Sequence, residues 1–250
     1  MQQTLDKRAE RQQCSATDPR STRTRRALRN ALAAEIAASG DLTQVTVTAV
    51  TDRAGVTRRT FYSHFCDIPD LVMQVEQETI ADLRPLVTDL AQVDLDGLSQ
   101  AIERHGACPG ADKILTYFKE REGYLAPLLG EGGDPAFTKR IEAMVREQVE
   151  QRAKSGLDLE LLSHIFDYYL TFAISAEVGV LVRWLTTGAH ESVELMARVM
   201  TALMFVRPGD LYGKQIDFDV SSFGMALLAS LSDDDLMRIA IDTEEKTDHD

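Results

Sequence analysis

Two short helices separated by a glycine form the strongest structural signal in the chain. Thr46 can cap a helix that starts at Val47, because a threonine hydroxyl accepts a hydrogen bond from the N–H groups of a first helical turn. Val47, Val50 and Ala54 recur at the helical period and form its apolar face. Gly55 can take the left-handed backbone conformation that turns the chain sharply. The segment therefore predicts a helix that ends in a tight turn.

The residues after this turn predict a second helix with a polar outer face. Thr57 can cap this helix, and Val56, Phe61 and Phe65 are spaced to pack inward. Two helices joined by a glycine-containing turn form a helix-turn-helix, whose second helix enters the major groove of DNA. The alternative is a small helical hairpin with a charged surface. The outward residues are Arg58, Arg59, Thr60, Tyr62 and His64.

The order of residues in this segment resembles the TetR family of bacterial transcription regulators. The resemblance covers about residues 22–75 and implies helices over 24–39, 47–54 and 58–64, followed by a connecting helix from 68 onward. The last of the three would be the recognition helix. Ile68 departs from the pattern, because the family usually has a lysine there, and a phosphate contact would be lost. The motifs that carry the resemblance are Thr46-Val47, Val50, Ala54-Gly55-Val56-Thr57, Thr60-Phe61-Tyr62-Ser63-His64-Phe65 and Leu71.

Charge is distributed unevenly along the chain. The net charge of −13 argues against a nonspecific nucleic-acid binder, yet residues 1–65 hold eleven Lys/Arg against six Asp/Glu. A basic N-terminal module on an acidic body favours DNA contact through one small face. Arginines at a helix N-terminus oppose the helix dipole, so phosphate contact explains their clustering better than a solvated helix start does. This basic cluster is Arg20, Arg23, Arg25, Arg26 and Arg29.

We therefore expect a palindromic double-stranded DNA operator as one partner of this protein. The candidate contacts come from the cluster of arginines, from the first predicted helix of the motif and from the outer face of the second. They are Arg23, Arg26, Thr46, Thr48, Thr57, Arg58, Arg59, Thr60, Tyr62 and His64.

Length and composition favour a cytoplasmic protein of one or two domains. The 250 residues are 44% apolar and can bury a sizeable core. The first residues lack the apolar run of a signal peptide, and no stretch approaches the ~18 apolar residues of a membrane helix. Cys14, Cys66 and Cys108 are too few and too far apart for a disulfide framework, which favours a reducing compartment. We expect no membrane partner.

The sequence does not favour an enzyme. His105 and Cys108 are the only neighbouring pair that suggests a metal or a nucleophile, and no nearby Cys or His completes a set of about four ligands. The chain has no glycine-rich phosphate loop, Gly-x-Ser-x-Gly or His-Glu-x-x-His motif. We therefore expect no catalytic residues, no metal and no cofactor.

The rest of the chain has helical periodicity and no strand pattern of any length. It predicts an all-α fold in which a three-helix DNA-binding domain joins a C-terminal helical regulatory and dimerisation domain. Pro85 is expected to kink or end the connecting helix. The expected divisions are a flexible arm over 1–20, the helix-turn-helix domain over 21–66, the ligand-binding and dimerisation domain over 67–206, and an acidic, partly disordered extension over 207–250 whose role is not readable.

Two long segments, 158–187 and 192–206, are apolar on more than one face. Each must therefore be covered from several sides, and a second copy of the pair would supply that cover as a four-helix homodimer interface. TetR-like proteins dimerise there as well. Small residues allow close helix approach in the middle of the first segment: Ala173, Ser175, Ala176 and Gly179.

The C-terminal half also resembles a TetR subgroup, through Gly123-Tyr124, residues 133–137 and residues 178–185. The family resemblance implies a repressor released by a small-molecule effector. The competing function is a DNA-bound interaction protein that recruits a protein partner and has no small-molecule ligand. Candidate ligand-binding residues, for which ordinary core packing is the favoured explanation, are Tyr117, His164, Tyr168, Phe172 and Trp184.

Overall fold

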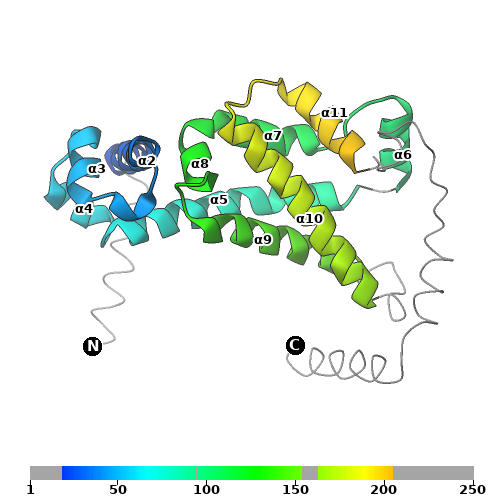
Figure 1. The fold of residues 1–250 in the computed structure, drawn as a ribbon, viewed down its shortest axis with the longest axis horizontal. Coiled ribbons are helices and arrows are strands. Elements are labelled where there is room, and N and C mark those ends of the chain that lie inside the picture. The colour runs from blue at the N-terminus through cyan, green and yellow to red at the C-terminus, as the bar shows by residue number, and fades with distance from the viewer. Residues whose placement is uncertain (1–18, 94, 154–162, 205–250) are drawn as a thin grey trace, which may run out of the picture.

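The computed structural model describes residues 19–93, 95–153 and 163–204 (Figure 1). These ranges contain ten α-helices, one 3-10 helix and no strand, so the predicted all-α fold is confirmed. The extension 207–250, the arm before residue 19 and the start of the segment 158–187 lie outside them. The elements are α2 (Pro19–Ser39), η1 (Leu42–Gln44), α3 (Val47–Ala54), α4 (Arg58–His64), α5 (Ile68–Ala91), α6 (Leu95–Glu103), α7 (Ala111–Glu120), α8 (Glu122–Leu129), α9 (Pro135–Ala153), α10 (Ser163–Thr186) and α11 (Val193–Leu203).

Helices α2, α3 and α4 form a small group at one end of the molecule (Figure 1). Leu28 and Leu32 of α2, Val50 of α3 and Phe61 of α4 are completely buried. They belong to one apolar core, which Phe65 extends toward α5. The apolar positions predicted from the helical period are therefore the ones that hold these three helices together.

Helix α5 runs from this group into the larger body (Figure 1). Asp67 caps it by accepting a hydrogen bond from the Asp70 N–H at 2.8 Å, and Pro69 lies in the first turn. Pro85 does not end the helix, which continues to Ala91. A proline removes one helical hydrogen bond, and the burial of Leu83 and Val87 against the body on either side of it offsets that loss.

Two other features of the helices differ from those expected. Helix α2 begins at Pro19, five residues before the predicted start, because proline is tolerated in a first helical turn. Helix α8 was not predicted, since Gly123 and Pro127 both disfavour a helix interior. Its burial explains its formation. Four of its eight residues are buried, Tyr124, Leu125, Leu128 and Leu129.

Helices α9, α10 and α11 complete the body around α5, α7 and α8 (Figure 1). Asp134 precedes α9 and accepts a hydrogen bond from the Ala136 N–H at 2.8 Å. Ser192 caps α11 by accepting a hydrogen bond from the Leu195 N–H at 3.1 Å. One face of α10 is buried against α7, α8 and α9, through Leu170, Ile174, Val178, Leu181 and Leu185.

A buried carboxylate joins α5 to α9. The Glu76 side chain is only 2% exposed, and it accepts a hydrogen bond from Arg140, which also contacts Asp134 at 2.6 Å. One oxygen of Glu76, Oε1, is buried and has no partner among the described residues. Burial raises the pKa of Glu76 from 4.5 to about 7, and Asp134 adds to the rise, while Arg140 opposes it. Arg140 is therefore needed to hold this charge inside the protein.

Replacing Arg140 should destabilise the protein mainly at alkaline pH. The folded pKa of Glu76 lies above its ordinary value, so its contribution to stability is greatest below about pH 4.5 and falls as the pH rises to about 7. In Arg140→Gln the ionised carboxylate loses its partner, and we expect a loss of about 3 kcal/mol at pH 8. At pH 5 the carboxyl is neutral and the loss should be much smaller.

Urea unfolding at both pH values measures this difference. Glu76→Gln is the matched background, because its amide can still accept from Arg140 and does not titrate. In this background, Arg140→Gln should destabilise the protein equally at pH 5 and pH 8. An equal effect of Arg140→Gln at the two pH values would contradict the assignment.

Candidate functional site

The turn between α3 and α4 is fixed by side-chain caps on both helices. Thr46 Oγ1 accepts a hydrogen bond from the Ala49 N–H at 3.2 Å, and Thr57 Oγ1 accepts from the Thr60 N–H at 3.1 Å. Gly55 has φ +66°, in the left-handed region that glycine tolerates without strain. The helix limits of 47–54 and 58–64 match the predicted ones. The two helices therefore form a helix-turn-helix with a defined geometry.

The outer face of α4 is exposed and carries its polar groups. Arg58 donates to Thr48 Oγ1 at 2.6 Å and so ties the two helices of the motif together. Arg59 is exposed and has no hydrogen bond or ion pair with any described residue. Tyr62 is 59% exposed, although its ring contacts the buried Phe61 edge-on at 5.5 Å. This face can reach another molecule without any rearrangement of the core.

His64 lies at the C-terminal end of α4 and is half-buried. Burial lowers its pKa, and the positive charge of Arg25 lowers it further. The imidazole is therefore neutral at neutral pH and offers one donor and one acceptor instead of a charge.

Two of the clustered arginines on α2 have partners within the protein. Arg25 donates to Gln74 at 3.0 Å, forms an ion pair with Glu78 and lies over the ring of Phe65 at 5.1 Å. Arg29 stacks on the ring of Tyr124 at 3.8 Å. Phosphate contact was expected for the whole cluster, but these two side chains connect α2 to α5 and α8 instead. Clustering in the sequence did not show which arginines face the body.

Helix α8 and the loop after it pack directly against α2 and η1. The Gly132 carbonyl accepts a hydrogen bond from the Leu42 N–H at 2.8 Å. The backbones approach so closely that a Cβ atom at Gly132 would lie 2.5 Å from the Gly40 carbonyl oxygen. Together with the Arg29–Tyr124 stack, this contact attaches the helix-turn-helix group to the body. We call it the α2–α8 junction.

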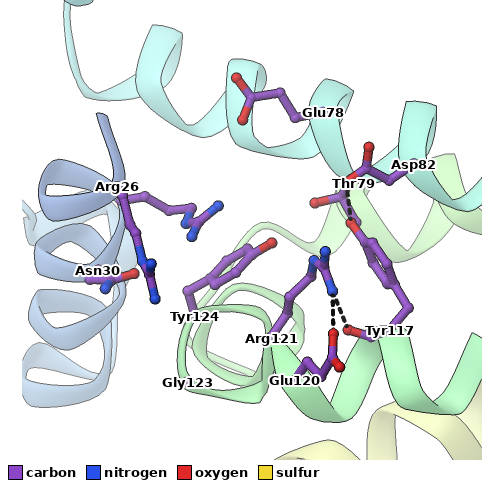
Figure 2. Close-up of a pocket in the computed structure, with 11 residues that line it drawn as sticks. Arg26, Asn30, Glu78, Thr79, Asp82, Tyr117, Glu120, Arg121, Gly123 and Tyr124 are labelled. Carbon is purple, nitrogen blue, oxygen red and sulfur yellow. Dashed lines mark hydrogen bonds and ion pairs between the residues drawn. The ribbon is translucent and has the colours of Figure 1, made fainter. Parts of the chain in front are cut away.

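A cavity of about 560 Å³ lies beside this junction (Figure 2). That volume is within the range of small-molecule sites in proteins. Helix α2 forms one wall, α5 a second, and the segment from α7 to α8 a third. The lining residues are Arg26, Arg29, Asn30, Glu78, Thr79, Asp82, Tyr117, Glu120, Arg121, Gly123 and Tyr124.

The carboxylates of the cavity are engaged by neighbouring side chains. Asp82 accepts from the Tyr117 hydroxyl at 3.2 Å, and Glu120 accepts from Arg121 at 3.2 Å (Figure 2). Glu78 pairs with Arg25. Burial raises the pKa of the Tyr117 hydroxyl above its ordinary value, so this group stays a neutral donor to Asp82.

The predicted ligand-binding residues are not brought together. Tyr117 lines the cavity, and Arg26, which was assigned to DNA, lines it too. Trp184 is buried elsewhere, with Lys119 5.6 Å above its ring. Tyr168 and Phe172 are 74% and 73% exposed on α10. The His164 side chain lies outside the described part of the chain.

Comparison with protein-family models identifies the C-terminal half. Residues 108–205, which span α7 to α11, match a TetR-type model described as a transcriptional regulator C-terminal region. This match supports a TetR-family regulator. No curated protein matches the chain. The family match indicates a transcriptional regulator and points away from an enzyme.

Exposed apolar side chains lie on both α10 and α11. Tyr168, Phe172 and Gly179 lie at helical spacing on α10, and all are exposed. By length and composition alone, Asp167–Thr186 could cross a membrane, and it is the one such helix in the described ranges. The expectation that no apolar stretch approaches the length of a membrane helix is therefore wrong. Further exposed apolar residues are Leu195, Val199 and Leu203 of α11 and Met204 directly after it.

Most of the residues that line the cavity were not predicted from the sequence as ligand contacts. Arg29 and Asn30 lie one turn after Arg26, and Tyr124 lies one turn after Glu120, so each wall follows a helical period that a sequence can display. The packing of the α2 face against the α8 face could not be predicted from the sequence, because α8 itself was not predicted. Across residues 19–93, 95–153 and 163–204, no cluster of three or more His, Cys, Asp or Glu residues could hold a metal ion.

Substitution of Gly132 should disturb the α2–α8 junction. In Gly132→Ala the new methyl group meets the backbone of Gly40, which cannot rotate away as a side chain can. We expect a loss of about 1–3 kcal/mol in the free energy of unfolding, as for other overpacked sites. Chemical denaturation measures it.

Gly123→Ala is the matched control for this prediction. A Cβ atom at Gly123 meets nothing within 4 Å, and alanine is a better helix former than glycine by up to ~1 kcal/mol. This variant should be as stable as the parent or more so. Equal stability of the two variants would mean that the close approach of Gly132 to Gly40 is not maintained in solution.

Proposed function

We propose that this TetR-family regulator is a sequence-specific DNA-binding repressor that acts as a homodimer on a palindromic operator. The observation that carries the proposal is the outer face of α4, where Arg59 and Tyr62 are exposed on a helix fixed at both ends by caps and core residues. A rigid helix that presents an unpaired arginine is suited to reading base edges in a major groove.

The distribution of charge supports the same function. The chain is acidic overall, and its positive charge is concentrated before residue 66. DNA would therefore be attracted to the helix-turn-helix and repelled by the body. Arg23 is exposed on α2 and belongs with the proposed phosphate contacts, together with Thr46, Thr48, Thr57 and Thr60. This distribution fits a cytoplasmic protein that acts on chromosomal DNA.

The exposed face of α10 and α11 supports a homodimer. Large apolar side chains on two adjacent helices leave an exposed apolar surface, which usually marks an interaction site. The same face contains Ser175, Ala176 and Gly179, which permit close approach of a second helix. A two-fold axis through this face would place two α4 helices on successive turns of DNA, about 34 Å apart or a multiple of it.

Alanine substitution on α4 should weaken operator binding. We expect Arg58→Ala and Arg59→Ala each to lower affinity, and at least one to relax base preference, because a bidentate arginine–guanine contact contributes about 1–3 kcal/mol. Tyr62→Phe should lower affinity equally for all sequences, since a phenol there is suited to phosphate.

Fluorescence anisotropy on an operator enriched from random-sequence DNA measures these effects. Arg104→Ala removes an exposed arginine from the body and should bind normally. Normal binding by both α4 arginine variants would rule out α4 as the recognition helix. Operator binding that changes only when a second protein is added would favour the recruiting function over release by a small molecule.

A leucine at Gly179 should prevent dimerisation without unfolding the protomer. A Cβ atom there meets nothing within 4 Å in the single chain, so a large side chain is tolerated until a second helix approaches. Sedimentation at micromolar concentration should show a dimeric parent and a dissociated Gly179→Leu variant.

Ala81→Leu is the control for this experiment. It adds the same side chain at an exposed position of α5, outside the α10–α11 face, and should remain dimeric. A monomeric parent protein, or a Gly179→Leu variant that dimerises as strongly as the parent, would exclude the proposed interface.

A further inference from the structure

The cavity beside the α2–α8 junction contains guanidinium groups that lack hydrogen-bond partners among the described residues. Arg26 has no hydrogen bond or ion pair with any residue in the described ranges. Among the described residues, Arg29 Nε is buried without a hydrogen-bond partner, and the guanidinium lies over the face of the Tyr124 ring. A buried guanidinium nitrogen without an acceptor is costly, and an anion in the cavity would remove that cost.

The positive groups come from both sides of the junction. Figure 2 shows Arg26 of α2 and Arg121, which precedes α8, extending into the same space on either side of Tyr124. The Arg121 side chain is stacked on the Tyr117 ring at 3.9 Å, and among the described residues it donates to the Tyr117 carbonyl and to Glu120, each at 3.2 Å. A single anionic group between these arginines would contact α2 and the α7–α8 segment at once.

The α5 wall limits the charge that a ligand can carry. Glu78 and Asp82 of α5 lie across the cavity, and they would repel a second anionic group. Carboxylates do accept hydrogen bonds from hydroxyl or ammonium groups. The cavity therefore suits a molecule with one anionic end and a hydrogen-bond donor at the other.

We propose that the cavity binds a small organic acid through one carboxylate, held by Arg26, Arg29 and Arg121, with a hydroxyl or amino group directed to Glu78 and Asp82. Arginine is suited to this task because its planar guanidinium matches a carboxylate with two parallel hydrogen bonds. The acid would bridge the helix-turn-helix group and the body, so its affinity would depend on how the two are arranged.

Binding of para-hydroxybenzoate to the full chain tests the site. This probe has one carboxylate and one hydroxyl, and para-hydroxybenzamide has the same shape without the charge. In calorimetry at low chloride, the acid should bind at least about tenfold more tightly than the amide. Arg26→Gln and Arg29→Gln should each abolish most of this difference, whereas Arg23→Gln, one turn away on α2 and outside the cavity, should retain it. Arg26 is exposed, so its variant should fold even if the Arg29 variant does not.

The outcomes separate the parts of the proposal. Equal binding of acid and amide, or an unchanged difference in both arginine variants, would overturn it. Inorganic phosphate that binds as tightly as para-hydroxybenzoate would overturn the assignment to an organic acid, because an anion without a separate hydroxyl or amino arm would then suffice.

The effect on DNA rests on the proposed function, whereas the calorimetry uses no DNA, so the two can fail separately. At saturating para-hydroxybenzoate the operator affinity should change, and the affinity of the acid for the operator complex must change by the same factor. An unchanged operator affinity would overturn the bridging role. Absence of any operator binding would instead count against the proposed function.

Discussion

The packing of α8 against α2 is the contact on which the rest of the structure depends. It consists of a backbone approach that only glycine permits, between Gly132 and Gly40, and of the stack of Arg29 on Tyr124. Without this contact, α5 alone would attach the helix-turn-helix group to the body. With it, residues of both parts line one cavity.

The buried charge in α5 shows a second constraint on the same connection. Glu76 lies on α5 where that helix meets α9, and its partner Arg140 also holds Asp134, two residues after Gly132. The loop that contacts Gly40 is therefore linked to a carboxylate whose pKa is close to 7. Burial of ionic groups contributes little net stability, but the loss of one partner is costly, so the ion pair restricts the positions that α5 and α9 can adopt.

The local parts of this structure could be predicted from sequence, and the long-range parts could not. Thr46, Gly55, Thr57 and Asp67 act on backbone groups within four residues, so the limits of α3 and α4 follow from the chain itself. The cavity depends on which face of α2 meets α8, and that choice is made by tertiary packing.

Aromatic content also misled the prediction of ligand contacts. Tyr168 and Phe172 have the periodicity of a core, and a sequence cannot show whether the apolar face that they form is buried in its own chain or left exposed for another molecule.

The neutral state of His64 has a separate consequence for DNA binding. Counterion release follows the number of phosphates that cationic side chains neutralise. Because burial and Arg25 both lower the pKa of His64, this residue would add nothing to that number at neutral pH. The salt dependence of operator binding would then be set by the arginines and would be the same at pH 7 and pH 8.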